Sequence, residues 1–469
     1  MAVTLVQALL PGTLTVALGL TGMGLVVAAW SFLGRTHRQL PTRTLYGIAA
    51  AWSAPLLAAA PLFSGDVWSY LAQGLITASG QDPYTLGPLP ALGSASPVTQ
   101  HVSHYWLETP APYGPAWLAL SRGVALVTGE HLIAAVGAYR MIALVGVALL
   151  AWALPRLARR AGADPSSAVW LGLLNPLVLW HLVAGVHNDA LLLGVVLCGL
   201  ELALSGMDRA FGQARIAAGL ALVTVAANIK VVGFAAVCCL AVVLARRGNP
   251  FRTVLGVAAG SAAVTAGISW WTGLGFGWIG AMGASTAVHS WLAPTNMLGF
   301  LVGGIGKLAG VQITEPAIRV LVLVGAAGCA VIVVRLLLAM YRGTLEVVRG
   351  LGLVLAAVVL CGPVVQPWYL LWAVLPLAAA ARRRRDRTIL AGVGAVLALA
   401  LPPVAAGVLP LITGYLAAGG LFALLALLLR PAAAARVAAG GRCRASVPSA
   451  RRRPRRQRPG RSAVRPAHP

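Results

Sequence analysis

The feature that most constrains this chain is its series of apolar runs, each bounded by charged residues, glycine or proline. Hydrophobic residues make up 59% of the sequence and charged residues 10%, and the mean hydropathy is +0.84. A water-soluble domain of this composition would expose large apolar patches, whereas a lipid environment covers them. The sequence therefore predicts an all-α polytopic membrane protein.

The apolar runs predict about 13 transmembrane helices, because a straight span needs roughly 20 residues. We expect residues 1–430 to form one membrane domain. Some of its spans are shorter than a straight crossing requires, so we expect broken or paired half-helices around Lys230 and from Gln366 to Trp368. The predicted spans are residues 12–34, 44–63, 132–154, 167–186, 190–206, 213–228, 231–245, 253–272, 317–340, 350–365, 368–381, 388–408 and 410–430.

Basic residues lie almost entirely between the predicted helices and in the C-terminal tail. By the order of the spans, all of these segments face the same side. This is the positive-inside pattern, and it predicts that these segments and the C-terminus are cytoplasmic in a multi-pass protein of the plasma membrane. The exceptions among the 36 Lys and Arg are Arg122, Arg140, Lys230, Lys307 and Arg319.

The arginine-rich tail, residues 431–469, contributes much of the formal net charge of +25. It has almost no apolar side chains to bury, so we expect it to be disordered. Attraction to the anionic head groups of membrane lipid accounts for its charge. No aromatic residue alternates with its arginines to stack on bases, which argues against a nucleic-acid partner.

Polar residues gather on the other side of the predicted bundle. It carries a long first outer loop, residues 64–114, and a second outer segment, residues 273–315, and most acidic residues and histidines lie in or near them. The stretch 115–128, which contains Arg122, is too short to cross and is expected to form an interfacial or re-entrant helix. This distribution predicts an active site on the extracytoplasmic face.

Asp66, in the segment FSGDVWSY, lies just beyond the outer end of the predicted span 44–63. A carboxylate is costly at this depth, which favours a functional role; a helix cap or an ion pair is the alternative. Transfer of a sugar from a sugar phosphate needs one base and a cation, because the phosphate is already a good leaving group. Asp66 is the candidate base, and the exceptional basic residues are the candidate cations.

A second polar group, His187-Asn188-Asp189, stands at the start of a predicted span. Asn or Asp at this position can cap the helix, so capping is the expected role of one of them. Aromatic residues such as Tyr70, Tyr84 and Tyr113 either anchor the protein at the membrane interface or pack against sugar rings.

No strong metal or nucleotide signature is present. His101 and His104 could share a helical face, but no third ligand follows at a convincing interval. The sequence has no glycine-rich loop of the kind that cradles phosphates, which disfavours a nucleotide-sugar donor. We therefore expect no cofactor, and the need for a divalent ion is left open.

Five segments resemble, in order and spacing, a known family: PLFSGDVWSYLAQG, QDPYTLGP, ETPAPYGPAWL, NPLVLWHLVAGVHNDALLLG and VVQPWYLLWAVLPLA. They are similar to the actinobacterial polyprenol-phosphate-mannose-dependent α-1,6-mannosyltransferases (MptA/MptB-like), which belong to the GT-C class of multi-span glycosyltransferases. The resemblance implies a GT-C-like helical bundle with a long first outer loop.

The resemblance also implies a reaction and a site. Mannose would move from polyprenyl-phosphate-mannose to an α-1,6-mannan acceptor of the lipomannan or lipoarabinomannan type, by an inverting single displacement with Asp66 as the catalytic base. Val67 follows Asp66, so the Asp-Glu pair of protein O-mannosyltransferases is absent, which argues against a protein acceptor. The candidate substrate-binding residues are Tyr70, Asp82, Tyr84, Glu108, Tyr113, Arg122, His187, Asn188, Asp189, Lys230 and Trp368.

Other functions are also compatible with the sequence. One is a transporter or flippase of a lipid-linked sugar, although such proteins usually show repeated halves and a site near the bilayer midplane, and this sequence shows neither. Another is a GT-C enzyme that uses a different polyprenyl-phosphate sugar. A catalytically silent scaffold for cell-wall enzymes is a third.

Overall fold

The computed structural model describes residues 2–283, 290–404 and 407–442. Helices account for 77% of the chain, and the described residues contain no strand, so the predicted all-α class is confirmed. Within the described part, six helical segments are long and apolar enough to cross a membrane: Gly12–Gln39, Leu132–Arg160, Asp189–Met207, Pro250–Thr272, Thr314–Arg342 and Val408–Leu428.

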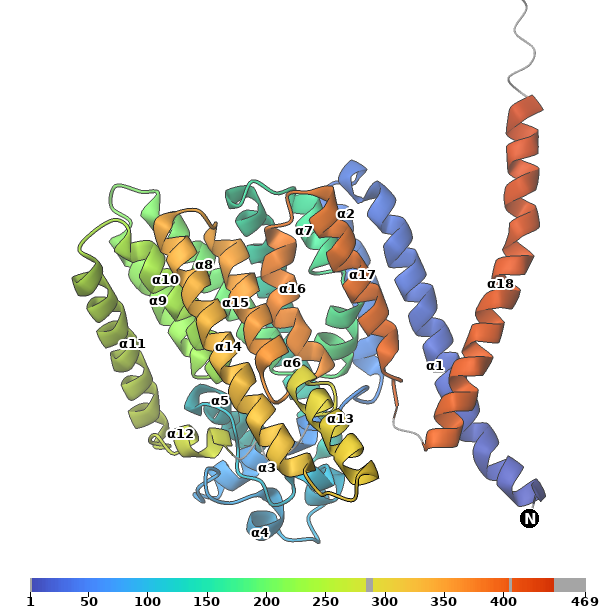
Figure 1. Ribbon diagram of the computed structural model, residues 1–469, viewed down its shortest axis with the longest axis horizontal. Helices are drawn as coiled ribbons and strands as arrows, with labels where there is room; N and C mark the ends of the chain where they lie inside the picture. Colours follow the sequence, from blue (N-terminus) through green and yellow to red (C-terminus); the bar gives the residue numbers. More distant parts are fainter. Residues whose placement is uncertain (1, 284–289, 405–406, 443–469) are drawn as a thin grey trace, which may run out of the picture.

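The α-helices follow one another along the chain as labelled in Figure 1. They are α1 (Ala2–Thr36), α2 (Thr42–Ala58), α3 (Asp66–Ala78), α4 (Pro88–Leu92), α5 (Pro115–Thr128), α6 (Leu132–Arg160), α7 (Pro165–Leu171), α8 (Asp189–Met207), α9 (Gln213–Ala227), α10 (Phe234–Ala245), α11 (Pro250–Thr272), α12 (Trp278–Ala281), α13 (Pro294–Leu308), α14 (Thr314–Arg342), α15 (Val347–Cys361), α16 (Leu370–Ala379), α17 (Arg384–Ala400) and α18 (Val408–Arg442).

Both predicted helix interruptions are present. Between α9 and α10, the chain leaves the helix at Asn228 and makes a short 3-10 turn, Val231–Gly233. Between α15 and α16 it runs extended and re-enters through a second 3-10 turn, Pro367–Tyr369, whose proline has no backbone N–H to continue a helix. These interruptions place Lys230 and Trp368 on irregular backbone, where their side chains are free to reach a site.

The segment predicted as a single span, 167–186, is not one continuous helix. Helix α7 ends at Leu171, and a π-helical turn, Val178–Ala184, follows after Asn175 and Pro176. The buried Asn175 amide donates to the carbonyl of Leu171 and accepts the N–H of Leu177, which satisfies the backbone at the break.

Small residues bring the central helices close together. An added Cβ at Gly146 of α6 would lie 2.2 Å from the backbone of Ala190 in α8, and one at Gly219 of α9 would lie 2.5 Å from the carbonyl oxygen of Gly199 in α8. Such contacts are typical of helix packing in membranes, where close backbone approach replaces the hydrophobic effect. Helices α6 and α9 therefore pack closely against α8, the most deeply buried of the long apolar helices in the described residues, which marks the centre of the bundle.

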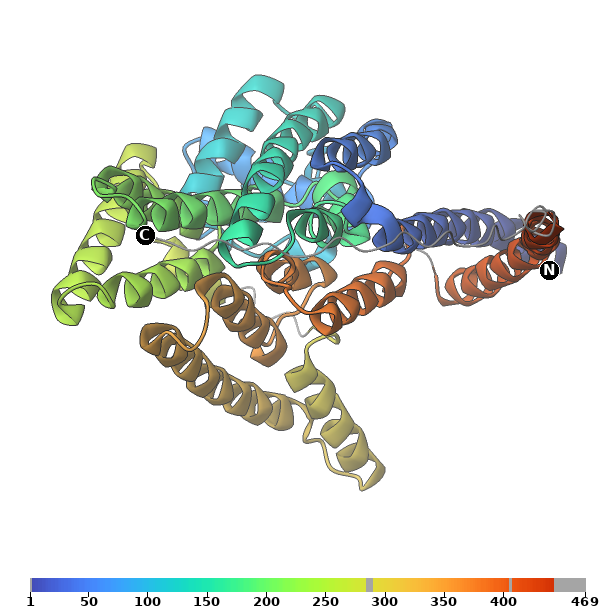
Figure 2. The ribbon, with the colours of Figure 1, turned by 90° about the horizontal axis from the view of Figure 1, so that it is seen from above.

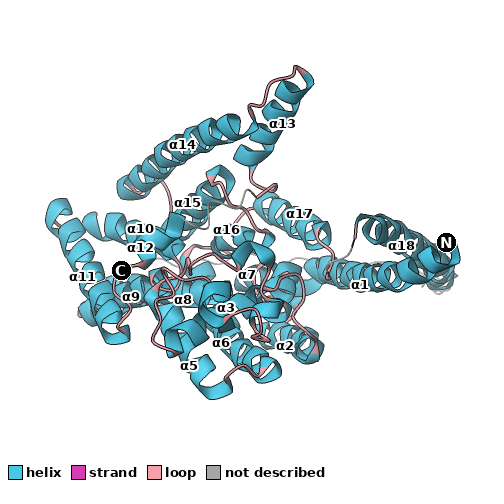
Figure 3. Cartoon of the chain, turned by 90° about the horizontal axis from the view of Figure 1, so that it is seen from below, coloured by secondary structure: helices cyan, strands magenta, loops and turns pink. Residues whose placement is uncertain are grey.

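Peripheral helices stand apart from this centre. Helices α1 and α18 lie against each other at one side of the molecule in two perpendicular views (Figures 1 and 2). Helices α13 and α14 lie at another edge (Figure 3). Helix α18 extends into the predicted tail 431–469, of which residues 443–469 lie outside the described residues, as do residues 284–289 of the predicted second outer segment.

Helices α3, α4 and α5 lie together at one end of the bundle (Figure 1). Helix α5, which carries Arg122, packs on α3: an added Cβ at Gly74 of α3 would lie 2.3 Å from the carbonyl oxygen of Ser121. The first loop is tied to the interruption after α9, because Gly114 donates to the Ile229 carbonyl and Ala116 to the Asn228 carbonyl. The end of the first loop therefore lies against the interruption that carries Lys230.

Candidate active site

The site is built where two strained turns meet. Phe63, just before α3, and Val186, just before α8, both have left-handed backbone conformations, with φ of 68° and 56°. Bulky and β-branched residues rarely adopt this conformation, and such strain is concentrated at functional sites. The two turns are joined by a hydrogen bond from the Leu62 N–H to the Ala184 carbonyl, 3.2 Å long.

Asp66 is the first residue of α3, with its carboxylate directed at the start of α8. Its Oδ2 lies 3.4 Å from Nδ1 of His187, and its backbone N–H donates to the Ser64 hydroxyl at 3.1 Å. The Asp66 side chain keeps 21% of its surface exposed, whereas His187 is completely buried. Asp66 can therefore be reached from outside, and His187 supports it from within.

The surroundings keep Asp66 ionised. Burial by itself would raise the pKa of its carboxyl, but His187, the Ser64 hydroxyl and the charge of Lys230 lower it, and the pKa lies below its ordinary value. A carboxylate of this kind is charged at neutral pH and can accept a proton.

An aromatic ring supports His187. The rings of His187 and Trp368 stack with their centroids 3.8 Å apart, and His181 lies 5.5 Å from the same tryptophan. Both ring nitrogens of His187 and the side-chain amide of Asn188 are buried and have no hydrogen-bond partner in the described residues, and Nδ1 makes only the 3.4 Å contact with Asp66. Buried polar groups are normally satisfied, so these atoms are candidates for contact with a bound molecule.

Asp189 and Lys230 form a buried ion pair beside this group. Nζ of Lys230 donates to both carboxylate oxygens of Asp189, at 3.1 and 3.0 Å, and the Trp372 indole N–H donates to Oδ1 at 2.6 Å. The Asp189 side chain is fully buried and that of Lys230 is 12% exposed. The pair holds an ammonium group at the edge of the site.

The expectation that Asn188 or Asp189 caps α8 was wrong. Asn188 occupies the cap position, but its side chain makes no capping hydrogen bond, and the Asp189 carboxylate is taken up by Lys230 and Trp372. A buried carboxylate forms a stronger hydrogen bond with a charged donor than with a backbone N–H. The charged donor here is Lys230, which lies 41 residues further along the chain.

Aromatic residues line the cluster. Tyr70 is buried and its hydroxyl accepts the N–H of Asn188 at 3.5 Å. Its ring meets that of Tyr113 edge-on, with centroids 5.5 Å apart, and Nζ of Lys230 lies 5.9 Å from the Tyr113 ring and 4.5 Å from that of Tyr369. These rings favour the ammonium through cation–π attraction.

The structure thus brings together Asp66 and seven of the predicted binding residues: Tyr70, Tyr113, His187, Asn188, Asp189, Lys230 and Trp368. Four others lie elsewhere. Asp82 accepts the N–H of Tyr84 in a local turn, and Tyr84 packs against Gly277 and Trp278. Glu108 and Arg122 are exposed, and Arg122 lines a separate cavity of about 200 Å³.

Arg140, another candidate cation, has a structural role. Its guanidinium donates to the carbonyl of Leu57, at 2.7 Å, and to that of Ala59, at the end of α2. It therefore satisfies the carbonyl groups that a helix end leaves unpaired. Lys230 is the candidate cation that joins the Asp66 cluster.

Sequence reasoning missed Trp372 and His181. Trp372 follows Trp368 by one helical turn, and His181 precedes His187 in the same motif, so a search for further polar-tipped side chains in these motifs could have found both. Within the described residues, no group of three or more His, Cys, Asp or Glu is arranged to hold a metal ion.

The two parts of the chain that supply this cluster both match known protein families. Residues 2–246, which contain Asp66, Asp189 and Lys230, match the model of the alpha-(1->6)-mannopyranosyltransferase N-terminal domain. Residues 294–430, which contain Trp368 and Trp372, match that of the MptB C-terminal domain. The chain belongs to the alpha-(1->6)-mannopyranosyltransferase family.

Curated relatives agree with this membership. A probable alpha-(1->6)-mannopyranosyltransferase of Mycolicibacterium smegmatis is 40% identical over 400 residues, which cover 79% of this chain and 72% of the relative. An alpha-(1->6)-mannopyranosyltransferase of Mycobacterium tuberculosis is 40% identical over 425 residues, with the same coverage of each chain. Alpha-(1->6)-mannopyranosyltransferase B of Corynebacterium glutamicum is 37% identical and is covered over 65% of its length. No solved structure matches the chain.

The family resemblance inferred from the five sequence segments is thereby confirmed. Membership of the alpha-(1->6)-mannopyranosyltransferase family supports mannosyl transfer as the activity. The long apolar helices support a membrane-bound enzyme.

Proposed function

We propose that this mannosyltransferase uses polyprenyl-phosphate-mannose as its donor and an α-1,6-mannan of the lipomannan or lipoarabinomannan type as its acceptor. The observation that carries the proposal is the pairing of two groups in one cluster: the accessible carboxylate of Asp66 and the ammonium of Lys230. A sugar phosphate donor needs a base for the acceptor and a cation for the leaving phosphate.

The proposed reaction is a single displacement. Asp66 takes the proton from a hydroxyl of the acceptor sugar as that oxygen forms a bond to C1 of mannose. The bond between C1 and the phosphate oxygen breaks, the electron pair leaves with the polyprenyl phosphate, and the configuration at C1 inverts. His187, with a proton on Nδ1, would donate to Asp66 and fix the orientation of the carboxylate.

Lys230 is the proposed partner of the leaving phosphate. Asp189 and Trp372 hold its ammonium group in place from the buried side, and its partly exposed side chain leaves that group at the edge of the cluster. A fixed cation stabilises the charge that develops on the phosphate without reorganisation during the reaction. Trp368 and Tyr113 would form the apolar walls for the sugar rings.

We further propose that the chain crosses the plasma membrane about 13 times, with the Asp66 cluster on the extracytoplasmic face and the C-terminus in the cytoplasm. The clustering of arginines away from Asp66 supports this orientation. A cysteine at the loop position Gln100 should react with an impermeant thiol reagent in intact cells, whereas a cysteine at the exposed Phe211 should react only after lysis. The reverse pattern would refute the orientation.

The donor is tested with the full-length protein in membrane vesicles. Vesicles that contain the protein should transfer radiolabelled mannose from polyprenyl-phosphate-mannose to a short synthetic α-1,6-mannoside, and the product should be sensitive to an α-1,6-specific mannosidase. Transfer from GDP-mannose alone, or from a different polyprenyl-phosphate sugar, would refute the donor assignment. Movement of the donor across the bilayer without a new glycosidic bond would favour a flippase.

A further inference from the structure

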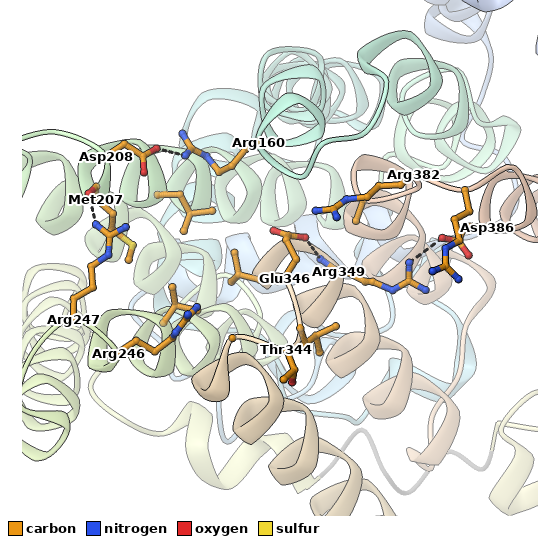
Figure 4. A pocket seen from close by; sticks show the side chains of 17 residues that line it. Arg160, Met207, Asp208, Arg246, Arg247, Thr344, Glu346, Arg349, Arg382 and Asp386 are labelled. Atoms are coloured by element: carbon orange, nitrogen blue, oxygen red, sulfur yellow. Dashed lines mark hydrogen bonds and ion pairs between the residues drawn. The ribbon is translucent and has the colours of Figure 1, made fainter.

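A polar cavity lies at the opposite end of the bundle from Asp66. Its volume is about 850 Å³, and it is lined by the ends of α6, α8 and α10, by the turn between α14 and α15, and by the start of α17 (Figure 4). It shares no residue with the candidate active site, so an inference about it is independent of the proposed function.

Arginines dominate the lining of this cavity. The lining carboxylates are Asp208, Glu346 and Asp386, and the lining arginines are Arg160, Arg246, Arg247, Arg349, Arg382 and Arg383. Figure 4 shows that these side chains come from separate segments and surround a common space. The cavity is therefore strongly positive.

The carboxylates are already engaged. Asp208 pairs with Arg160, and Asp386 lies 2.8 Å from Arg349. Glu346 accepts the backbone N–H groups of Val348 and Arg349, at 2.8 and 3.0 Å, as the cap of α15. These carboxylates therefore have little capacity left to neutralise the remaining arginines.

Two of the lining arginines have no partner for their side chains in the described part of the chain. Arg247 donates to the Met207 carbonyl and Arg382 to the Ala161 carbonyl, but the side chains of Arg246 and Arg383 have no hydrogen bond or ion pair among the described residues. A guanidinium carries five N–H donors in a fork that matches a phosphate group. Two such forks therefore face the cavity without a protein partner.

The backbone makes room for one of them. Gly343 has a left-handed conformation, with φ of 78°, and an added Cβ there would lie 2.5 Å from the Arg246 guanidinium. The left-handed turn that ends α14 requires glycine at position 343, and this glycine leaves space beside the flexible end of the Arg246 side chain.

We propose that this cavity binds a phosphate ester through Arg246 and Arg383. The phosphate can come from the head group of an anionic membrane lipid or from a soluble phosphate compound, and both present the same charged oxygens to the two guanidinium groups. Arg247 and Arg382, which bond only backbone carbonyls, add long-range attraction.

The test compares two double variants of the full-length protein in nanodiscs. Arg246→Gln/Arg383→Gln removes the unpaired guanidinium groups, and Arg43→Gln/Arg252→Gln removes two exposed arginines that do not line the cavity. The first probe is phosphatidylglycerol: native mass spectrometry measures how much of this lipid the protein retains when it is released from nanodiscs made with or without phosphatidylglycerol. The second probe is radiolabelled pyrophosphate, whose binding is measured by equilibrium dialysis.

The wild type should bind one of the two probes, and the cavity variant should lose about tenfold or more in affinity, while the control variant stays within about twofold. If the protein retains phosphatidylglycerol and pyrophosphate does not displace it, the ligand is a lipid head group. If pyrophosphate binds in nanodiscs of neutral lipid, the ligand is a soluble phosphate compound. Equal losses in the two variants, or no binding of either probe, would overturn the proposal.

Discussion

Replacing Asp189 by asparagine should destabilise the enzyme strongly. The substitution leaves the shape of the side chain intact but removes the charge that Lys230 faces at 3.0 Å, in a place where the carboxylate is fully buried. Loss of one partner from a buried ion pair costs about 3–5 kcal/mol, because the other charge remains buried and unpaired. This corresponds to a factor of about 10² to 4 × 10³ in the ratio of folded to unfolded protein, since each 1.4 kcal/mol is a factor of ten.

The measurement is the thermal or denaturant-induced unfolding of the purified protein in detergent. Asp208→Asn is the matched control, because Asp208 follows the other end of α8 and its side chain, which pairs with Arg160, is 55% exposed. Exposed pairs contribute about 0–1 kcal/mol, so this variant should unfold close to the wild type. An Asp189→Asn variant as stable as the Asp208→Asn variant would refute the buried pair.

A double variant separates stability from catalysis. Asp189→Asn/Lys230→Met removes both charges, so most of the lost stability should return, because no unpaired charge stays buried. Mannosyl transfer should be absent from this double variant, because the cation for the leaving phosphate is missing. Recovery of transfer together with stability would show that Lys230 has only a structural role.

Two further predictions follow from the geometry. Because His187 helps to hold the pKa of Asp66 below its ordinary value, His187→Gln should raise that pKa and move the acid limb of kcat/KM to higher pH than in the wild type. A pH–rate profile with an unchanged acid limb would contradict the contact. Gly114→Ala should destabilise the protein by about 1–3 kcal/mol, because its Cβ would lie 2.2 Å from a backbone carbonyl oxygen, whereas Gly123→Ala meets open space and should leave stability unchanged or slightly higher. Equal unfolding midpoints for the two variants would argue against close packing of the first loop.

The sequence predicts the positions of the apolar spans well, because an apolar run of sufficient length favours a helix buried in the membrane, but helices α3 and α13 lie in segments that were predicted as outer loops. Helices lie in all the predicted segments, and the interruptions at Lys230 and before Trp368 are present. The division of 167–186 was missed because its apolar run continues through Asn175 and Pro176, and only the internal hydrogen bonds of Asn175 reveal the break.

The site was predicted less completely, because its contacts join distant parts of the chain. The motifs identified Asp66, His187 and Asp189, but the partners of Asp189 lie 41 and 183 residues away, and no local pattern reports such a pairing. Asp82 and Tyr84 lie in a motif close to Asp66 in sequence, yet they serve a local turn and a separate apolar cluster. Nearness in the chain was a poor guide to nearness in space.

The most direct test of the account is mannosyl transfer by Asp66→Asn, measured in membranes with polyprenyl-phosphate-mannose and an α-1,6-mannoside acceptor. Asp82→Asn is the control, because it removes the same charge from the same loop and keeps an oxygen that can accept the N–H of Tyr84. We predict that Asp66→Asn is expressed at the wild-type level and has no transfer activity, while Asp82→Asn remains active. Full activity in Asp66→Asn would contradict the assignment of Asp66 as the base.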